Sequence, residues 1–312
     1  MQTSINPLND PHQSSRTIGL LNELMALFWT GRWGFTCASV LALLINKQTA
    51  ERLVRAKLMR RVKNANPYAF ANAGLVLTKK GLARALELRE RFKGDAFADA
   101  VLRERGFYYW IFTARATPAL GKARGQVFNH DLKLQTILAS LIRNFGAGWA
   151  ATLGVASPST VATTREMERE ARRVGSRIAD FRVTGTDDAD APITFLLEFE
   201  STRKRVDEVD RMCAQWSDTV MHSSRRVLVL CDTPALMRLW RVAIARDEVP
   251  RYLRRDGHWV KAYDEQKRLL MRPVPYDDRV QVKDAKWSEI KMFKRKPTRE
   301  NALEHRTRPA SP

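Results

Sequence analysis

LVLTKKGLARA, residues 75–85, changes along its length from a strand pattern to a helix pattern. Leu75 to Thr78 is a short β-type run, and Lys79-Lys80-Gly81 then opens a helix that we expect to continue through Leu88. Upstream, Met59 to Val62 is a second β-type run, and the segment that follows it, KNANP, has the composition of a loop. The sequence therefore predicts a β-hairpin followed by a helix.

Three helices are predicted before this hairpin. Apolar residues recur at helical spacing from Thr17 to Phe28, and Thr36 is the predicted N-cap of a second helix that carries Val40 and Leu44. A third helix is expected from about Gln48 to Leu58. This order of helices, hairpin and helix resembles that of bacterial winged-helix domains, which assigns residues 17–92 to a DNA-binding domain and leaves residues 1–16 as a disordered leader.

The third helix is basic, and a basic helix fits the major groove of DNA, where cationic and amide side chains reach guanine edges and phosphates. The alternative is a solvated helix face in a protein–protein module. The predicted DNA contacts on this helix and on the wing with its flanks are Lys47, Gln48, Thr49, Arg52, Arg55, Arg60, Arg61, Lys63, Lys79 and Lys80.

The whole chain is strongly basic. Its 312 residues contain 54 Lys and Arg against 34 Asp and Glu, a formal charge of +20. That excess favours a polyanionic partner, and double-stranded DNA is the leading one. An anionic membrane is the rival, but it requires a basic amphipathic helix with a wide apolar face or a lipidation site, and we find neither. The length predicts two domains, each with its own core.

The compartment is predicted to be the cytoplasm. The N-terminus lacks a basic start followed by an apolar run, so it does not read as a secretory signal. Ile18 to Ile45 is the most apolar stretch, but polar residues interrupt it, which favours a pair of core helices over a membrane span. The three cysteines are widely spaced and are predicted to be buried thiols.

Residues 93–127 are predicted to connect the two domains. The aromatic run from Phe107 to Phe112 lies here among arginines, and such residues can stack on unpaired bases. The run is dense rather than spaced, so we expect a strand buried against a helix.

The second half of the chain predicts an α/β domain over residues 128–275, followed by a basic tail over residues 276–312. The fold class is therefore α+β, with a central mixed sheet in the second domain. The elements expected there are a helix from about His130 to Ile142, strands at Ile178–Val183, Ile193–Phe199 and Arg226–Cys231, and helices at Val206–Trp216 and Pro234–Ala245.

Three acidic residues stand on two of these strands. Alternation along the second strand sends Glu198 and Glu200 to one face, with Asp180 on the neighbouring strand. Oxygen ligands of this kind suit Mg²⁺ or Mn²⁺, whose bound water can attack a phosphodiester, and Lys204 would neutralise charge on the phosphate. The alternative is a half-exposed strand whose glutamates pair with Arg203 or Arg205.

Asp180 followed by Glu198-x-Glu200 resembles the PD-(D/E)xK core of restriction endonucleases. Ala179 stands where that family commonly has proline, and Glu200 where it commonly has lysine. With the winged helix, the His130-Asp131-Leu132 helix start and the segment TTREM at residues 163–167, the chain resembles the replication-relaxation group and the MobC-type plasmid relaxases.

The resemblance implies a metal-dependent DNA endonuclease that nicks plasmid DNA at a transfer origin, working beside a coupling or accessory mobilisation protein. Asp180, Glu198 and Glu200 would bind the metal, with Glu166 as a further acid. His130 would bind substrate or act as an acid or base, although a histidine at a helix start is more often structural. Tyr108 and Tyr109 are less favoured candidates for a covalent nucleophile. The alternative is a non-catalytic replication or mobilisation accessory protein or a repressor.

Overall fold

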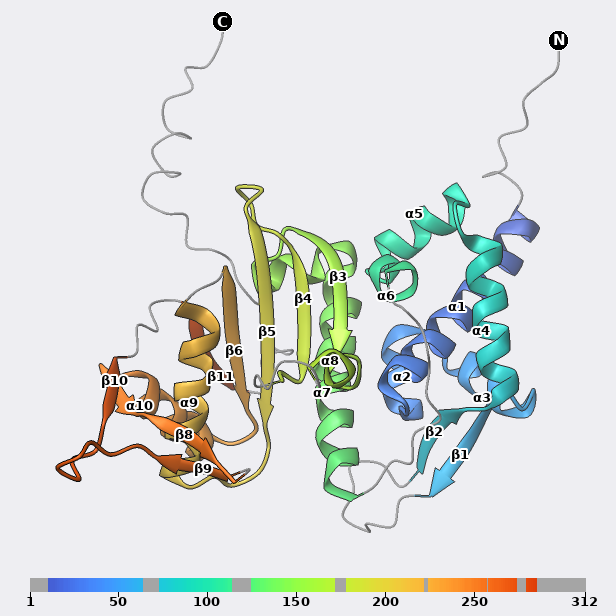
Figure 1. Cartoon of the computed structure of the whole chain (residues 1–312). Helices are drawn as coiled ribbons and strands as arrows, with labels where there is room; N and C mark the ends of the chain where they lie inside the picture. Colours follow the sequence, from blue (N-terminus) through green and yellow to red (C-terminus); the bar gives the residue numbers. More distant parts are fainter. Residues whose placement is uncertain are drawn as a thin grey trace, which may run out of the picture.

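The computed structural model describes residues 11–63, 73–113, 125–171, 178–221, 224–256, 258–273 and 279–284. It is a mixed α+β structure in which a mainly helical N-terminal unit packs beside a central sheet (Figure 1). The α+β class with a mixed central sheet is confirmed.

The N-terminal unit contains a two-stranded antiparallel hairpin framed by helices. Strands β1 and β2 pair with Arg61 opposite Leu75. A separate bridge joins Thr36, in the segment before α2, to Leu75, so that segment adds a third short extended piece beside β2. The elements are α1 (Pro11–Trp33), α2 (Ala38–Leu44), α3 (Lys47–Arg55), β1 (Met59–Lys63), β2 (Ala73–Leu77) and α4 (Lys79–Phe92).

The boundaries of the first three helices differ from prediction. Helix α1 begins at Pro11, inside the predicted disordered leader. The N-cap of α2 is Cys37 rather than Thr36. Helix α3 ends at Arg55, three residues before the predicted end at Leu58, because Lys57 adopts a left-handed conformation (φ 58°) that a continuing helix cannot contain.

The predicted connecting region contains two helices, α5 (Ala96–Glu104) and α6 (Tyr108–Phe112). The aromatic run is therefore helical, and the prediction of a strand was wrong. Phe107, Trp110 and Ile111 are fully buried, a spacing that one face of a helix presents and alternating strand residues do not.

The central sheet has five strands in the order β11-β6-β5-β4-β3. Strands β3, β4 and β5 form an antiparallel meander, and β5, β6 and β11 are parallel neighbours. The elements in and around it are α7 (Gly125–Phe145), β3 (Ser157–Thr163), α8 (Thr164–Ala171), β4 (Phe181–Thr186), β5 (Pro192–Glu200), α9 (Val206–Met221), β6 (Arg225–Cys231), α10 (Pro234–Ile244) and β11 (Val280–Asp284).

Three features of the sheet depart from prediction. Strand β3 was not predicted, because its outer half is exposed and carries no apolar alternation. Asp180 precedes β4 instead of standing within a strand. Strand β11 lies inside the predicted basic tail, where pairing with β6 buries Val280 and Val282.

Two small antiparallel pairs complete the C-terminal side (Figure 1). They are β7 (Glu248–Pro250) with β10 (Met271–Pro273), and the hairpin of β8 (Tyr252–Arg255) with β9 (His258–Lys261).

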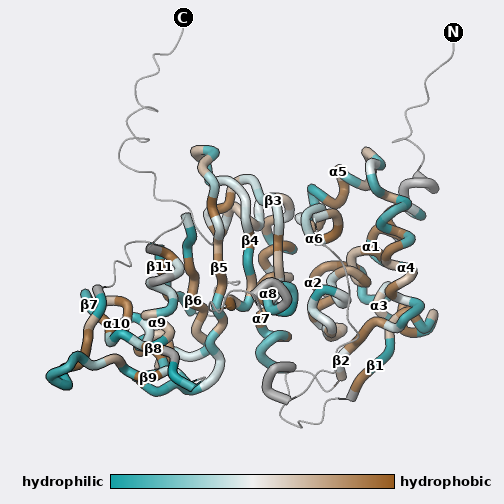
Figure 2. The backbone as a smooth tube through the Cα atoms, in the orientation of Figure 1, coloured by the Kyte–Doolittle hydropathy of each residue, from teal (hydrophilic) through white to brown (hydrophobic). Residues whose placement is uncertain are grey.

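A single hydrophobic cluster joins the N-terminal helices to one face of the sheet. It runs from Leu21 and Trp29 in α1 through Trp110 in α6 to Phe181 and Leu197 in the sheet. A second cluster lies on the opposite face, under α9 and α10. Figure 2 shows the hydrophobic residues concentrated along α1 and α2 and along the strands. One core is therefore shared by the two halves of the chain, and the other lies within the C-terminal half.

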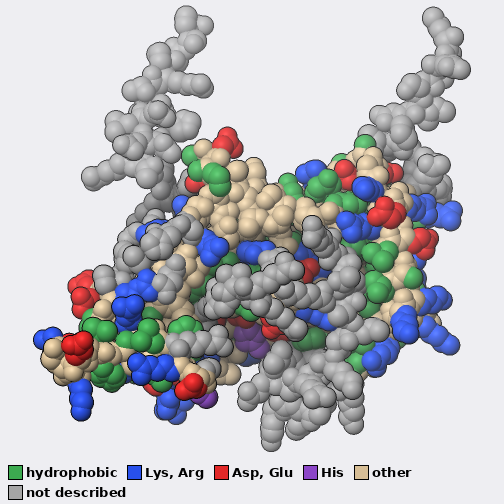
Figure 3. Space-filling model, viewed as in Figure 1, with side chains coloured by type: hydrophobic (Ala, Val, Ile, Leu, Met, Phe, Trp, Pro, Cys, Tyr) green, Lys and Arg blue, Asp and Glu red, His purple; other side chains and the backbone are tan. Residues whose placement is uncertain are grey.

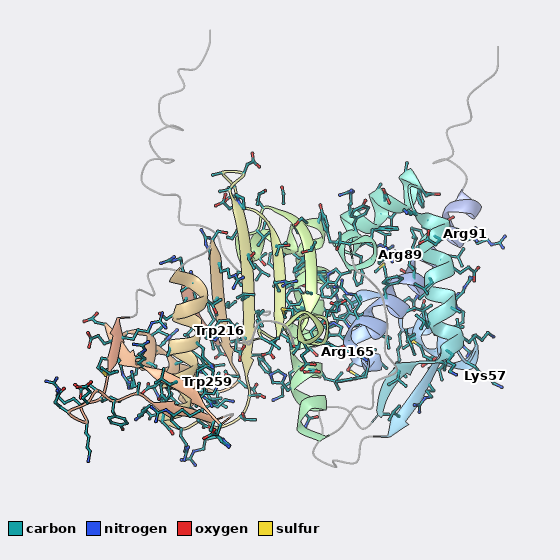
Figure 4. All side chains as sticks on the ribbon, viewed as in Figure 1. Lys57, Arg89, Arg91, Arg165, Trp216 and Trp259 are labelled. Atoms are coloured by element: carbon teal, nitrogen blue, oxygen red, sulfur yellow. The ribbon has the colours of Figure 1, made fainter. Side chains whose placement is uncertain are left out.

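Buried polar contacts reinforce this junction. Arg32 in α1 is 4% exposed, and its guanidinium donates to the Trp110 carbonyl, to the Val161 carbonyl and to the carboxylate of Glu166 in α8. Arg165 in α8 places its guanidinium against Gly34, directly after α1, and is labelled in Figure 4. Charge pairing and packing thus hold the helical unit against β3 and α8.

Candidate nucleic-acid interface and acidic edge

Helix α3 presents one basic face to solvent. The Asn46 side chain caps its N-terminus by accepting from the Gln48 backbone N–H, while Ala50 and Leu53 pack inward. Lys47, Gln48 and Arg55 are exposed. The capped, amphipathic helix therefore holds two cations and an amide outward, as predicted.

Two residues predicted on this face have other surroundings. Thr49 is only 8% exposed, because the helix turns it toward the core, so it does not belong to the exposed face of α3. The Arg52 guanidinium lies 3.4 Å from the Gly19 carbonyl and 3.6 Å from the Glu23 carboxylate. Because Gly19 and Glu23 belong to α1, the Arg52 side chain is directed toward α1. Glu23 also accepts from Arg84 at 2.8 Å.

The N-terminus of α4 is fastened to the end of α3. Thr78 caps α4 by accepting from the Gly81 N–H, and its hydroxyl lies 2.8 Å from the Lys57 carbonyl. A Cβ at Gly81 would lie 1.9 Å from the Leu58 carbonyl oxygen, so only glycine permits this approach. The contact places the exposed Lys79 and the exposed Lys57 in the same region.

Lys57 was not among the predicted contacts. The sequence signal that could have identified Lys57 is the helix start at Thr78 to Gly81, because the Thr78 hydroxyl donates to the Lys57 carbonyl just after α3. Lys63, another predicted contact, ends β1. We use the name α3 surface for the exposed residues Lys47, Gln48, Arg55, Lys57, Arg60, Arg61, Lys79 and Lys80.

Lys and Arg side chains follow the right-hand border of the molecule in Figure 3, where Figure 1 places α3, β1 and α4. Lys57 is labelled at this border in Figure 4. Within the described part of the chain, no ion pair joins Lys47, Arg55 or Arg60 to a carboxylate. The α3 surface therefore presents cations that remain open to a polyanion.

A second group of charged residues lies where β5 and β6 end. We name it the acidic edge, and it comprises His130, Asp131, Lys133, Asp180, Glu198, Glu200, Lys204 and Asp232. His130 in α7 is its centre. The ring Nδ1 lies 3.1 Å from the Asp131 carboxylate, and Nε2 lies 2.8 Å from the Phe199 carbonyl and 3.4 Å from the Asp180 carboxylate. Both ring nitrogens face acceptors, so both are donors and the ring is an imidazolium.

Burial lowers the pKa of His130, but the hydrogen bonds to Asp131 and Asp180 raise it further than burial lowers it, to about 11. His130 is therefore a resident cation of the edge. One helical turn on, Lys133 pairs with Asp232, which follows β6. These two cations attach α7 to the sheet at two points.

Asp180 is held by several backbone groups. Its carboxylate accepts the Phe199 N–H at 2.7 Å, and its carbonyl accepts the Thr164 N–H and hydroxyl. The Asp180 side chain thus continues the ladder between β4 and β5 beyond the last strand pair, Phe181 with Leu197.

Glu198 and Glu200 are 6% and 3% exposed, so the alternative of a half-exposed strand was wrong. They share a face of β5 with Leu196, which packs under α9 and α10, whereas Phe199 packs on the α7 side. Lys204 lies 3.3 Å from the Glu200 carboxylate. It is Lys204, and not Arg203 or Arg205, that pairs with a glutamate of the strand; Arg205 pairs with Asp207.

The predicted metal ligands do not form a ready metal site. Among the residues that the structure describes, no group of three or more His, Cys, Asp or Glu side chains is placed to hold a metal ion. Asp180 turns to the Phe199 N–H and His130, while Glu198 and Glu200 point to the opposite face. The arrangement therefore does not fit a metal ion held by Asp180, Glu198 and Glu200 together.

The remaining predicted catalytic residues are engaged elsewhere. Both carboxylate oxygens of Glu166 accept from Arg32, and one also accepts from the Thr163 N–H, so Glu166 joins α8 to α1 instead of serving the acidic edge. Tyr108 and Tyr109 lie in α6, where the Arg103 guanidinium sits 3.6 Å from the Tyr108 ring centroid. All three cysteines are buried and free, as predicted.

Comparison with known protein families, with characterised proteins and with solved structures found no match for this chain. The resemblance to plasmid relaxases thus stays a prediction. Over the described residues, none of the helices combines the length and hydrophobicity needed to traverse a bilayer.

Proposed function

We propose that the protein binds double-stranded DNA through the α3 surface, with α3 in the major groove and the β1–β2 hairpin as a wing. The observation that carries the proposal is the exposed set Lys47, Gln48 and Arg55 on a capped helix directly before a hairpin with exposed Arg60 and Arg61. Cations and amides of this kind contact phosphates and base edges.

The order of the elements supports a winged-helix reading. Three helices precede the hairpin, and the Thr36–Leu75 bridge adds a short extended segment to it. The formal charge of +20 supplies long-range attraction for a polyanion.

The test measures duplex binding against salt concentration by fluorescence anisotropy, with a labelled mixed-sequence duplex. Lys47→Gln with Arg55→Gln removes two charges from the α3 surface. If each charge contacts one phosphate, the slope of log K against log salt becomes shallower by about 1.8. The matched control is Arg91→Gln with Lys93→Gln, two exposed cations at the other end of α4. Equal slopes for both double variants would reject the α3 surface as the DNA site.

A second candidate function is an endonuclease that nicks plasmid DNA at a transfer origin. The observation that favours it is topological: α7, the antiparallel β3-β4-β5 meander, α9 and the parallel β6 follow the order of the restriction-endonuclease core. Asp180 directly precedes β4, beside the end of β5 where Glu198 and Glu200 stand. As in that family, Mg²⁺ or Mn²⁺ would activate a bound water as the nucleophile, and a mobilisation or coupling protein would be the partner.

We derive no cleavage step, because the three carboxylates do not share one face. The test incubates supercoiled plasmid carrying a transfer origin with Mg²⁺ or Mn²⁺, using the wild type, Asp180→Ala and Glu198→Ala. Open circles formed by the wild type alone would support the nuclease. Intact supercoils together with retained duplex binding would leave a non-catalytic DNA-binding protein.

A further inference from the structure

The C-terminal β8–β9 hairpin and the turn that follows it form a second basic surface. Residues 251–272 contain seven Lys and Arg against three Asp and Glu. The register of β8 and β9 puts Trp259 and Lys261 on one face of the hairpin and Arg255 and Val260 on the other. We name the exposed residues Lys261, Tyr263 and Lys267 the hairpin surface.

Aromatic side chains flank Lys261 at a spacing of two residues, which places Trp259, Lys261 and Tyr263 on one face. Tyr263 is 57% exposed. Trp259 is half-buried on β9 and is labelled in Figure 4. These apolar groups are separated by charges, and a membrane-binding face would need them contiguous. Cations interleaved with aromatic rings suit a nucleic acid strand, whose phosphates need charge and whose unpaired bases need a stacking partner.

The hairpin surface rests on an ordered scaffold. The Arg251 N–H donates to the Leu270 carbonyl, and the Ala262 N–H donates to the Arg251 carbonyl, both at 2.9 Å. The Asp264 carboxylate accepts the Arg268 N–H at 2.8 Å, which closes the turn after Tyr263. Val249 and Ala262 are buried beneath. The exposed side chains are therefore presented by backbone that is hydrogen-bonded before any ligand arrives, which lowers the entropy lost on binding.

The same scaffold is attached beside the acidic edge. The Tyr252 hydroxyl donates to the Asp207 carbonyl at 3.1 Å, in the first turn of α9. That turn directly follows Lys204, which pairs with Glu200. A nucleic acid strand bound to the hairpin surface would therefore pass close to the end of β5.

We propose that the hairpin surface binds single-stranded DNA, with its cations on the phosphates and Tyr263 stacked on an unpaired base. The proposal rests on the proposed DNA-binding function and extends it, because the α3 surface would hold duplex while the hairpin surface holds an adjacent unpaired strand. The two surfaces share no residue, so each can be tested alone.

The test uses the full-length chain and a labelled, mixed-sequence single-stranded oligonucleotide. Tyr263→Ala should weaken its binding about fivefold or more, the loss expected for one stacked base, whereas Tyr263→Phe should bind like the wild type because it keeps the ring. Lys261→Gln with Lys267→Gln should make the salt slope shallower by about 1.4. The control is again Arg91→Gln with Lys93→Gln.

Single-strand binding that is the same in the wild type, Tyr263→Ala and Lys261→Gln/Lys267→Gln would overturn the proposal. So would variants that lose binding to phosphatidylserine vesicles while keeping the oligonucleotide, an outcome that assigns the surface to a membrane. Lys47→Gln/Arg55→Gln should weaken duplex binding and leave the Tyr263→Ala effect on single strands intact. If Lys47→Gln/Arg55→Gln leaves duplex binding unchanged while Tyr263→Ala weakens single-strand binding, the proposed duplex-binding function is rejected. The single-strand result alone then supports the hairpin proposal.

Discussion

On the α3 surface, Lys47, Arg55 and Arg60 extend into solvent, whereas at the acidic edge His130, Lys133 and Lys204 each lie within reach of a carboxylate. The same kinds of side chain therefore have different uses. Cations without an internal counter-charge attract an external polyanion, and cations beside Asp180, Asp232 and Glu200 stabilise the fold.

This comparison explains why charge alone does not locate function. The acidic edge has the residue types of a phosphodiester-cleaving site, yet Asp180, Asp232 and Glu200 each lie beside a resident cation. Among the residues that the structure describes, no carboxylate forms an ion pair with Lys47, Arg55 or Arg60 of the α3 surface, and this surface is the stronger candidate for a ligand site. The predictions below test whether internal pairing is what separates the two groups.

The largest effect is expected at Arg32, the most buried of the paired cations. Arg32→Met should lower the free energy of unfolding by about 3 to 5 kcal/mol, because it leaves the Glu166 carboxylate without its cation. Urea denaturation measures this loss. The double variant Arg32→Met/Glu166→Gln should recover part of it. A single variant as stable as the wild type would show that the pair does not hold α1 to α8.

His130→Gln tests whether the acidic edge is stabilised by a resident charge. The pKa of about 11 lies above the ordinary value near 6.5, so the folded state binds a proton that the unfolded state releases between these values. The stabilisation is complete below about pH 6.5 and is lost as the pH rises toward 11. The imidazolium bonds should contribute about 2 kcal/mol at neutral pH.

The measurement for His130 is the free energy of unfolding at several pH values between about 6 and 10, a range that starts near the unfolded pKa of histidine and runs toward the folded value of about 11. The wild type should lose stability relative to His130→Gln as the pH rises. Parallel curves for the two proteins would contradict a charged histidine at this edge.

Gly81→Ala tests the contact that arranges the α3 surface. The added methyl would meet the Leu58 carbonyl at 1.9 Å, so the backbone must shift, and the free energy of unfolding should fall by about 1 to 2 kcal/mol. Gly148→Ala is the control, because nothing lies within 4 Å of a Cβ there. Thermal denaturation of both variants should show a lower midpoint for Gly81→Ala only.

The smallest and most local effect compares two arginines of one helix. Arg55→Gln should weaken duplex binding and make the salt slope shallower by about 0.9, as for one phosphate contact. Arg52→Gln should change the slope less, because Glu23 already shares that charge. If Arg52→Gln had the larger effect, the ion pair with Glu23 would not decide which arginine is available to DNA.

Elements with a strong local pattern were predicted well. Strand β6 and helices α9 and α10 carry continuous or periodic apolar residues, and the structure contains each of them close to its expected position. Strand β3 and strand β11 were missed, because one is an edge strand with a polar outer half and the other is a short segment within a basic region. Pairing with β4 and β6, and not local composition, makes them strands.

Sequence alone determined the net charge of +20, the basic α3, the hairpin after it and the shared face of Glu198 and Glu200, because these follow from residue identity and from the periods of helix and strand. Tertiary structure decided which charges are paired. Arg32 meets Glu166 and His130 meets Asp180 across long stretches of chain, and only folding brings such residues together. Since an ion pair depends on distance in space, spacing along the chain could predict that Asp180 and Glu198 are neighbours but not that His130 would already hold Asp180.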